Sequence, residues 1–161
     1  MSRILRFTLE RRGYRVLHDR RIPGHRRVDQ MVIGPTGVWL VDNQAWHPDT
    51  EIAAYGGRLF IGKLTGAEMA SELRAMAVTA ASVLSGELGW DIVAAPLVAV
   101  HGGKVARAGL TADGLTVQRG FRVPGWIRRR HLAHYGPDQV EEVTRAAIRV
   151  LPVGGRTMAP D

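Results

Sequence analysis

The sequence predicts an α/β protein with a mixed central β-sheet flanked by helices. Short apolar runs alternate along the chain with longer segments whose apolar residues recur at helical spacing. Two of the runs, 28–33 and 38–42, are almost continuously apolar, which is typical of strands covered on both faces. The 161 residues, 45% of them hydrophobic, suffice for one domain with its own core. We therefore expect a single domain over residues 1–151 and a flexible tail at 152–161.

The N-terminal third is predicted to begin with a helix and to continue as three strands. Residues 3–12 show helical periodicity, and Gly13 supplies the stop. The apolar face of this helix consists of Ile4, Leu5, Thr8 and Leu9. Residues 14–18 alternate between apolar and polar and form the first expected strand, ahead of the two apolar runs at 28–33 and 38–42.

The middle of the chain is predicted to hold a hairpin or edge strand and then a long helix. The pair Gly56-Gly57 lies between short apolar runs within residues 55–63, as in a tight turn. Thr65 and Glu68 have the spacing of a capping box, which marks the start of the helix. Gly86 is expected to end it.

The last third predicts two strands and a closing helix. Residues 92–100 are an apolar run interrupted by Pro96, which favours an edge position or a late strand start. Residues 115–118 form a short strand, and residues 123–135 are a basic segment with room for a short helix. In the final helix, residues 138–150, the acidic residues come early and the arginines late, as the helix dipole prefers.

Arginine supplies most of the positive charge, because Lys63 and Lys104 are the only lysines in a chain of net charge +7. Arginine suits bidentate phosphate contacts, so the composition favours a nucleic acid as partner. The coding bias of a GC-rich genome explains the same composition equally well. The absence of cysteine excludes disulfides, thiolate metal sites and a cysteine nucleophile. We expect a cytoplasmic protein without membrane contact, since we find neither a signal peptide nor an apolar run of about 18 residues.

Two carboxylates flank a predicted hairpin. Asp29 opens the strand at 28–33, Asp42 closes the strand at 38–42, and the turn Gly34-Pro35-Thr36-Gly37 joins them. A hairpin of this kind brings its two ends together, and converging carboxylates suit a hard divalent cation. Taken singly, each aspartate also has an ordinary interpretation, as a local turn residue or as a polar strand end.

Two arginine-rich segments are candidate nucleic-acid-binding surfaces. One precedes Asp29 directly and would hold a phosphate backbone beside the carboxylates; it consists of Arg20, Arg21, Arg26 and Arg27. The other follows Trp126, a combination that suits single strands; it consists of Arg128, Arg129 and Arg130. The competing interpretation of the second segment is a solvated helix with Trp126 against the core.

Further segments occur in a characteristic order around the hairpin. They are Val16-Leu17-His18-Asp19, Ile22-Pro23-Gly24, Val41-Asp42-Asn43-Gln44-Ala45-Trp46, Gly56-Gly57-Arg58-Leu59-Phe60 and Asp113-Gly114-Leu115-Thr116-Val117. With the hairpin they resemble the nuclease-related domain (NERD) family, a branch of the PD-(D/E)XK nuclease superfamily. The resemblance covers roughly residues 3–150 and implies a restriction-endonuclease-like core.

The resemblance also implies roles for the hairpin residues. Asp29 and Asp42 would bind Mg²⁺, with Mn²⁺ as a substitute, and Asn43 would add its backbone carbonyl. Gln44 occupies the place of the lysine that stands near the attacking water in the superfamily. The implied activity is Mg²⁺-dependent hydrolysis of DNA phosphodiester bonds, with Asp29, Asp42 and Gln44 as catalytic residues, and weak because glutamine carries no charge.

Two departures from the family pattern keep an alternative open. Gln44 replaces the expected lysine, and the glutamate that many members carry early in the first helix has only Glu10, at the other end, as a poor substitute. The alternative is a catalytically inactive nuclease fold that binds nucleic acid or a partner protein, for instance in a defence or repair assembly. An oligomer is compatible with either interpretation.

Overall fold

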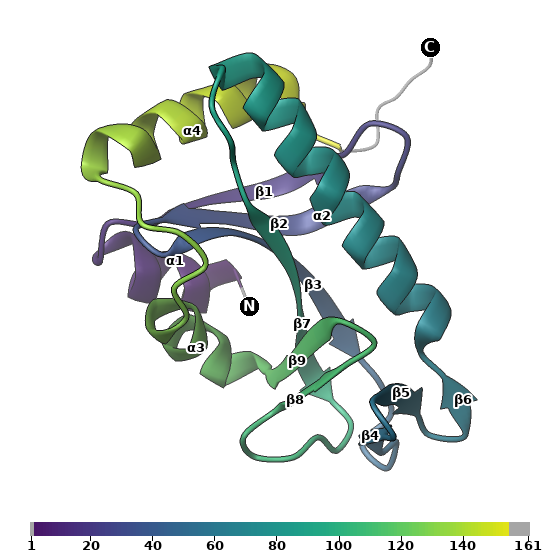
Figure 1. The fold of residues 1–161 in the computed structure, drawn as a ribbon. Coiled ribbons are helices and arrows are strands. Elements are labelled where there is room, and N and C mark those ends of the chain that lie inside the picture. The colour runs from purple at the N-terminus through teal and green to yellow at the C-terminus, as the bar shows by residue number, and fades with distance from the viewer. Residues whose placement is uncertain (1, 155–161) are drawn as a thin grey trace.

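The apolar strands assemble into one six-stranded mixed sheet with the order β1-β2-β3-β7-β9-β8 (Figure 1). The computed structural model describes residues 2–154. The strands are β1 (Arg15–Arg21), β2 (Arg27–Gly34), β3 (Gly37–Ala45), β7 (Ala94–Gly102), β8 (Leu110–Ala112) and β9 (Leu115–Arg119). Strands β1, β2 and β3 form an antiparallel meander, β3, β7 and β9 are parallel, and β8 pairs antiparallel with β9. The predicted α/β class with a mixed sheet is confirmed.

Helices cover both faces of this sheet. The helices are α1 (Ser2–Glu10), α2 (Ala67–Leu88), α3 (Val123–Arg129) and α4 (Pro137–Val150), with the short 3₁₀ helix η1 (Gly120–Arg122) before α3. Helices α1 and α3 pack on the face that carries Trp39 and Val41. Helices α2 and α4 pack on the face that carries Met31 and Leu40. The predicted apolar face of α1 is buried at Leu5 and Leu9, whereas the side chain of Ile4 lies outside the described residues.

The turn between β2 and β3 is fixed by contacts on the α1–α3 side. Gly34 lies against the ring of Tyr14, where an added Cβ would come within 2.0 Å of the ring carbon Cδ2. The Tyr14 hydroxyl is 2.7 Å from the Thr36 hydroxyl, which donates to the Ile127 carbonyl at 2.9 Å. These buried contacts tie the turn to α3 and so help to hold the hairpin in position.

The predicted hairpin at Gly56-Gly57 is confirmed, in a separate small sheet. This sheet has the order β4-β5-β6 and contains β4 (Ile52–Tyr55), β5 (Arg58–Ile61) and β6 (Leu64–Thr65). Gly56 and Gly57 have φ values of 58° and 77°, which residues with a side chain rarely adopt.

Of the two alternatives predicted from Pro96, the edge position is wrong, because β7 lies between β3 and β9, whereas the strand does start late, at Ala94. Pro96 pairs with Leu40 of β3, but the pairing of β7 with β9 begins only at Leu97. Within the described strands, Pro96 therefore has a neighbour on one side only, and its missing N–H disrupts no second ladder.

The ends of α2 also differ from the prediction. The N-cap is Gly66, so the predicted capping box of Thr65 and Glu68 does not form, although Thr65 Oγ1 accepts the Ala67 N–H at 3.2 Å. The helix continues through Gly86 and ends at Gly89, which adopts the left-handed conformation with φ 80°. Gly89 can take this conformation without steric cost, and its N–H donates to the Ser85 carbonyl.

The start of the predicted tail lies beside β1. The Arg21 N–H donates to the Pro152 carbonyl at 2.8 Å, and Val153 forms an isolated antiparallel bridge with Arg20. The rest of the predicted tail, residues 155–161, lies outside the described residues. Over residues 2–154, none of the helices has the length and apolar character needed to cross a bilayer.

Candidate functional site

The register of the β2–β3 hairpin brings Asp29 next to the residue that follows Asp42. The ladder pairs Gln30 with Val41, so Asp29 and Asp42 are the next positions along the two strands. The Asn43 backbone N–H donates to the Asp29 carboxylate at 2.8 Å. The carboxylate of Asp29 thus replaces a carbonyl as the partner of a β3 amide, at the point where the ladder stops.

The carboxylate of Asp42 is buried and holds two donors. Its side chain lies on the same face of β3 as that of Leu40, toward α2, and the residue is 2% exposed. Arg26 Nη2 lies 3.1 Å from Oδ1, and Gln44 Nε2 donates to Oδ2 at 2.6 Å. Burying a charge is costly unless the charge is paired and hydrogen-bonded, as that of Asp42 is here.

Arg26 also connects Asp42 to α2. Its Nε lies 3.5 Å from Oε1 of Glu72, so one guanidinium lies between two carboxylates. Burial by itself lowers the pKa of Arg26, but Asp42 and Glu72 outweigh that effect and hold the pKa above its ordinary value. The side chain of Arg26 remains 41% exposed, which leaves it room to move into solvent.

Asn43 points to the opposite face and links three strands. Its Nδ2 donates to Gln30 Oε1 at 2.7 Å, and its Oδ1 is 2.8 Å from His101 Nε2 on β7. Burial lowers the pKa of His101 below its ordinary value, which favours the neutral ring near pH 7. The bond to His101 fixes the Asn43 side chain, and the Asn43 backbone lies within β3.

One residue of the first arginine-rich segment contacts a carboxylate of the site, and the other three have partners elsewhere. Arg26 reaches Asp42, but Arg20 and Arg21 donate to the carbonyls of Leu151 and Gly154, both at 3.2 Å. Arg27 forms an ion pair with Asp19. Three of the four predicted phosphate-binding arginines therefore already have partners within the protein.

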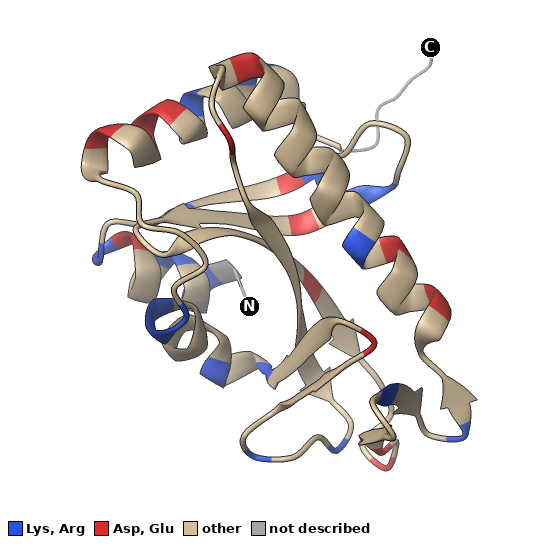
Figure 2. Ribbon diagram, viewed as in Figure 1, with Lys and Arg blue, Asp and Glu red and all other residues tan. Residues whose placement is uncertain are grey.

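The second arginine-rich segment lies on the other side of the sheet. Arg128, Arg129 and Arg130 are exposed on and just after α3, which packs with α1 against the face opposite to α2. Figure 2 shows basic positions on both α1 and α3 and acidic positions in the first half of α2. Trp126 packs partly buried against the core, and the Arg130 guanidinium lies 5.7 Å from the centre of its ring. The fold does not bring this segment together with Asp42.

Glu72 and His101 belong to the site but have no local signal in the sequence. Glu72 shares Arg26 with Asp42 from a helix 30 residues further along the chain, and His101 reaches Asn43 across 58 residues. Only the packing of α2 on the sheet and the parallel pairing of β3 with β7 create these contacts.

The oxygen donors fit a hard divalent cation in kind. Asp29, Asp42 and the Asn43 carbonyl are oxygen ligands, and Mg²⁺ needs few protein ligands because it keeps several waters. Within residues 2–154, no group of three or more His, Asp or Glu side chains is arranged to hold a metal ion. A cation at Asp42 would therefore depend on two carboxylates and a carbonyl, and would take over the charge compensation that Arg26 provides.

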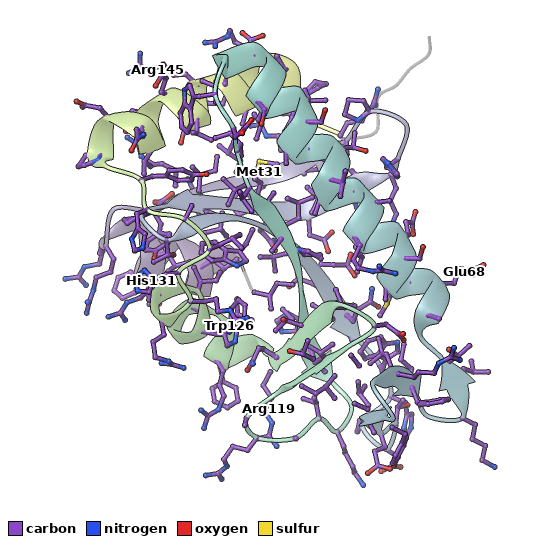
Figure 3. All side chains as sticks on the ribbon, in the orientation of Figure 1. Met31, Glu68, Arg119, Trp126, His131 and Arg145 are labelled. Carbon is purple, nitrogen blue, oxygen red and sulfur yellow. The ribbon has the colours of Figure 1, made fainter. Side chains whose placement is uncertain are left out.

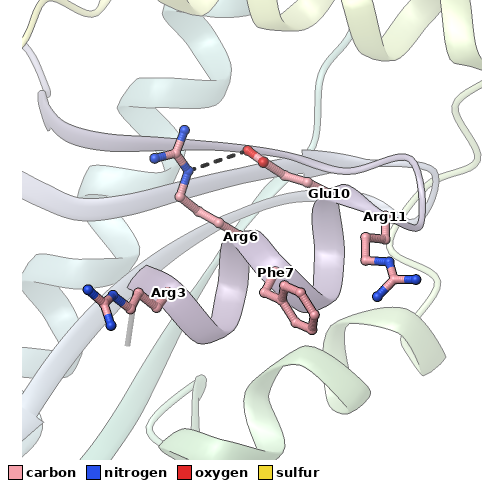
Figure 4. Close-up of a pocket in the computed structure, with 5 residues that line it drawn as sticks. All are labelled: Arg3, Arg6, Phe7, Glu10 and Arg11. Carbon is pink, nitrogen blue, oxygen red and sulfur yellow. Dashed lines mark ion pairs between the residues drawn. The ribbon is translucent and has the colours of Figure 1, made fainter.

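A hollow of about 740 Å³ lies elsewhere, on the solvent side of α1 (Figure 4). It is lined by Arg3, Arg6, Phe7, Glu10 and Arg11. Arg6 pairs with Glu10 at 3.6 Å, and the Arg11 guanidinium lies 5.3 Å from the centre of the Phe7 ring. The hollow contains none of the predicted site residues.

The fold and the hairpin thus define an α/β protein of nuclease-like architecture, with two aspartates on adjacent strands of a mixed sheet. Residues 1–81 match the nuclease-related domain family, and this match covers half of the 161 residues, so the chain belongs to that family. The matched part contains α1, the β1–β3 meander and most of α2. No curated protein and no solved structure matches the chain.

Proposed function

We propose that the protein is a Mg²⁺-dependent nuclease that hydrolyses DNA phosphodiester bonds slowly, with Mn²⁺ as a substitute metal. The observation that carries this proposal is the contact of the Asp29 carboxylate with the backbone of Asn43, directly beside Asp42. Membership of the nuclease-related domain family supports the reaction class. The excess of arginine supports a polyanionic substrate.

Each site residue has a defined part in this proposal. Asp29, Asp42 and the Asn43 carbonyl would hold the cation. When bound, Mg²⁺ would supply a more acidic water and neutralise charge on the phosphoryl oxygens. Gln44 would orient the water by donating a hydrogen bond from its amide, which lies 2.6 Å from Asp42. Because an amide adds no positive charge, the rate would stay low.

Arg26 would leave Asp42 when the cation binds. Its guanidinium compensates the buried carboxylate through a 3.1 Å contact, and its side chain is 41% exposed. A released Arg26 would remain close enough to contact the phosphate backbone of the substrate. This sequence of events gives Arg26 two alternative partners with the same charge, a carboxylate and a phosphate.

The alternative function is nucleic-acid binding without catalysis. The observation that favours it is the occupation of both Asp42 oxygens, by Arg26 and by Gln44. If Arg26 is a permanent counter-ion, the carboxylate pair is structural and no cation binds.

Metal binding and cleavage separate the two functions. Calorimetric titration with Mn²⁺ and cleavage of supercoiled and single-stranded DNA in Mg²⁺ would be measured for the wild type, Asp29→Asn and Asp42→Asn. Asp138→Asn is the matched control, since Asp138 is an exposed aspartate on α4. We expect metal binding and cleavage in the wild type and in Asp138→Asn only. A wild type that binds DNA but neither binds Mn²⁺ nor cuts would establish the alternative.

A further inference from the structure

A second cavity lies where β7 and β9 end. Its volume is about 460 Å³. The basic and aromatic side chains that line it are those of His101, Lys104, Arg119 and Phe121. No acidic residue is among the described residues that line it. Figure 3 labels Arg119 at this end of the molecule, far from Arg145 on α4.

The cavity and the carboxylate site lie at the same end of the parallel strands. In the parallel strands, Gln44 pairs with Val100 and Val100 pairs with Arg119, so the three residues form one row. Two inter-strand steps separate Gln44 from Arg119, roughly 10 Å between their Cα atoms. His101 lines the cavity and contacts Asn43 at 2.8 Å. Asn43 and His101 face away from Asp42, so a polymer bound at Asp42 would reach the cavity around the carboxyl ends of β3, β7 and β9.

One positive charge of the cavity is fixed by hydrogen bonds, and the other is exposed to solvent. Arg119 donates from Nε and Nη2 to the Val105 carbonyl at 3.2 and 3.0 Å, which fixes the guanidinium. Lys104 is 67% exposed, and its ion pair with Asp49 at 3.9 Å joins two well-solvated groups. Lys104 is therefore available to an anion that enters the cavity.

Phe121 adds an aromatic surface beside these charges. Its side chain is 65% exposed, although a phenyl ring gains free energy when it is covered. The Arg122 guanidinium lies 5.6 Å from the centre of the ring and leaves it largely accessible. Basic side chains next to an exposed aromatic ring suit a ligand with both a phosphate and a flat base.

We propose that this cavity binds one nucleotide of a single-stranded DNA segment, with Lys104 and Arg119 on the phosphate and Phe121 stacked on the base. The inference rests on the proposed function for the identity of the polymer, and it places the strand that flanks the cleaved bond. It does not require cleavage, because the cavity residues are distinct from Asp29 and Asp42.

The test is binding of a fluorescently labelled twelve-residue oligothymidylate in EDTA, measured by anisotropy at several salt concentrations. Phe121→Ala is compared with Phe7→Ala, since Phe7 is a second exposed phenylalanine that lies against an arginine. Lys104→Gln is compared with Lys63→Gln, which changes the only other lysine. A duplex of the same length is the second ligand, because its bases are already stacked.

We expect Phe121→Ala to weaken oligothymidylate binding about fivefold or more and to leave duplex binding nearly unchanged. Lys104→Gln should reduce the slope of log affinity against log salt by about 0.7, the value for one lost phosphate contact on a single strand. Phe7→Ala and Lys63→Gln should bind as the wild type does. Equal effects of Phe121→Ala and Phe7→Ala, or equal salt slopes for the two lysine variants, would overturn the inference.

The same measurements keep this inference apart from the proposed function. If the wild type cuts DNA while Phe121→Ala and Lys104→Gln bind normally, the cavity assignment is wrong and the nuclease assignment stands. If the two variants bind weakly but no form of the protein cuts DNA, the reverse holds.

Discussion

The Arg26 guanidinium lies 3.1 Å from the Asp42 carboxylate, and it is a charge partner of a group that is almost completely buried. The two residues come from different parts of the meander, since Arg26 precedes β2 and Asp42 lies in β3. The contact makes the ionised carboxylate tolerable inside the protein. It also occupies one of the oxygen atoms that a cation would need.

Replacing Arg26 by alanine should show how far the buried Asp42 carboxylate depends on the guanidinium. Without the guanidinium, the Gln44 amide is the donor that Asp42 keeps among the described residues, and the free energy of unfolding should fall by about 1–3 kcal/mol. A bound cation would restore the missing charge, so Mn²⁺ should raise the melting temperature of Arg26→Ala more than that of the wild type. Thermal unfolding with and without Mn²⁺ measures both effects.

The control for this experiment is Arg145→Ala, which removes an exposed arginine from α4. Its melting temperature should respond to Mn²⁺ as the wild type does. Identical Mn²⁺ responses of Arg26→Ala and Arg145→Ala would contradict competition between Arg26 and a cation at Asp42.

Gln44→Lys should increase metal-dependent DNA cleavage at least about tenfold, equivalent to about 1.4 kcal/mol of transition-state stabilisation. The Gln44 amide is 2.6 Å from Asp42, so an ammonium group at this place would bring a positive charge to the reacting water. Gln44→Met is the matched control, because its side chain is unbranched but has neither charge nor donor. Initial rates of plasmid nicking compare the three proteins, and a lysine variant no faster than the methionine variant would refute the role given to Gln44.

Gly34→Ala should disturb the turn that positions the two aspartates. Its Cβ would meet the Tyr14 ring at 2.0 Å, and the displaced ring would lose the hydroxyl contact with Thr36. We expect the free energy of unfolding, from urea titrations, to fall by about 1–3 kcal/mol. Gly86→Ala is the control: no atom lies within 4 Å of the added Cβ, and alanine should stabilise the helix by about 0.5–1 kcal/mol. Similar losses in both variants would show that the contact with Tyr14 is not the cause.

His18 should make stability depend on pH below neutrality. Burial, reinforced by Arg6 and Arg20, lowers the pKa of His18 from 6.5, and its Nε2 is a buried atom without a hydrogen-bond partner among the described residues. The unfolded chain therefore binds a proton more readily than the folded protein does. The stability that comes from this difference is present above pH 6.5 and falls as the pH drops through that value.

Urea unfolding at pH 7.5 and pH 5.5 measures this loss of stability. His18→Gln should reduce the difference between the two pH values. His47→Gln is the matched control at a histidine whose side chain is 72% exposed. An unchanged difference in His18→Gln would assign the pH dependence to other groups.

Local patterns in the sequence were sufficient to predict most elements of the fold. The hairpin at residues 28–42 follows from two apolar runs and a Gly-Pro-Thr-Gly turn, and α4 follows from its amphipathic periodicity and charge order. Pro96 left an edge position and a late strand start open, and the choice between them depends on where β9 begins to pair, at Leu97. The cap of α2 was also missed, because a capping-box spacing does not require that the side chains form the bonds.

The sequence by itself determined the α/β class, the β2–β3 hairpin and the adjacency of Asp29 and Asp42, since alternation and turn chemistry act over a few residues. Only the tertiary structure decided the surroundings of that pair. It pairs Arg26 with Asp42, and it adds Glu72 from α2 and His101 from β7 to the site. Arg128, Arg129 and Arg130 lie on the opposite face of the sheet. These arrangements depend on how helices pack on the sheet and on which strands pair in parallel, and no short stretch of sequence encodes either.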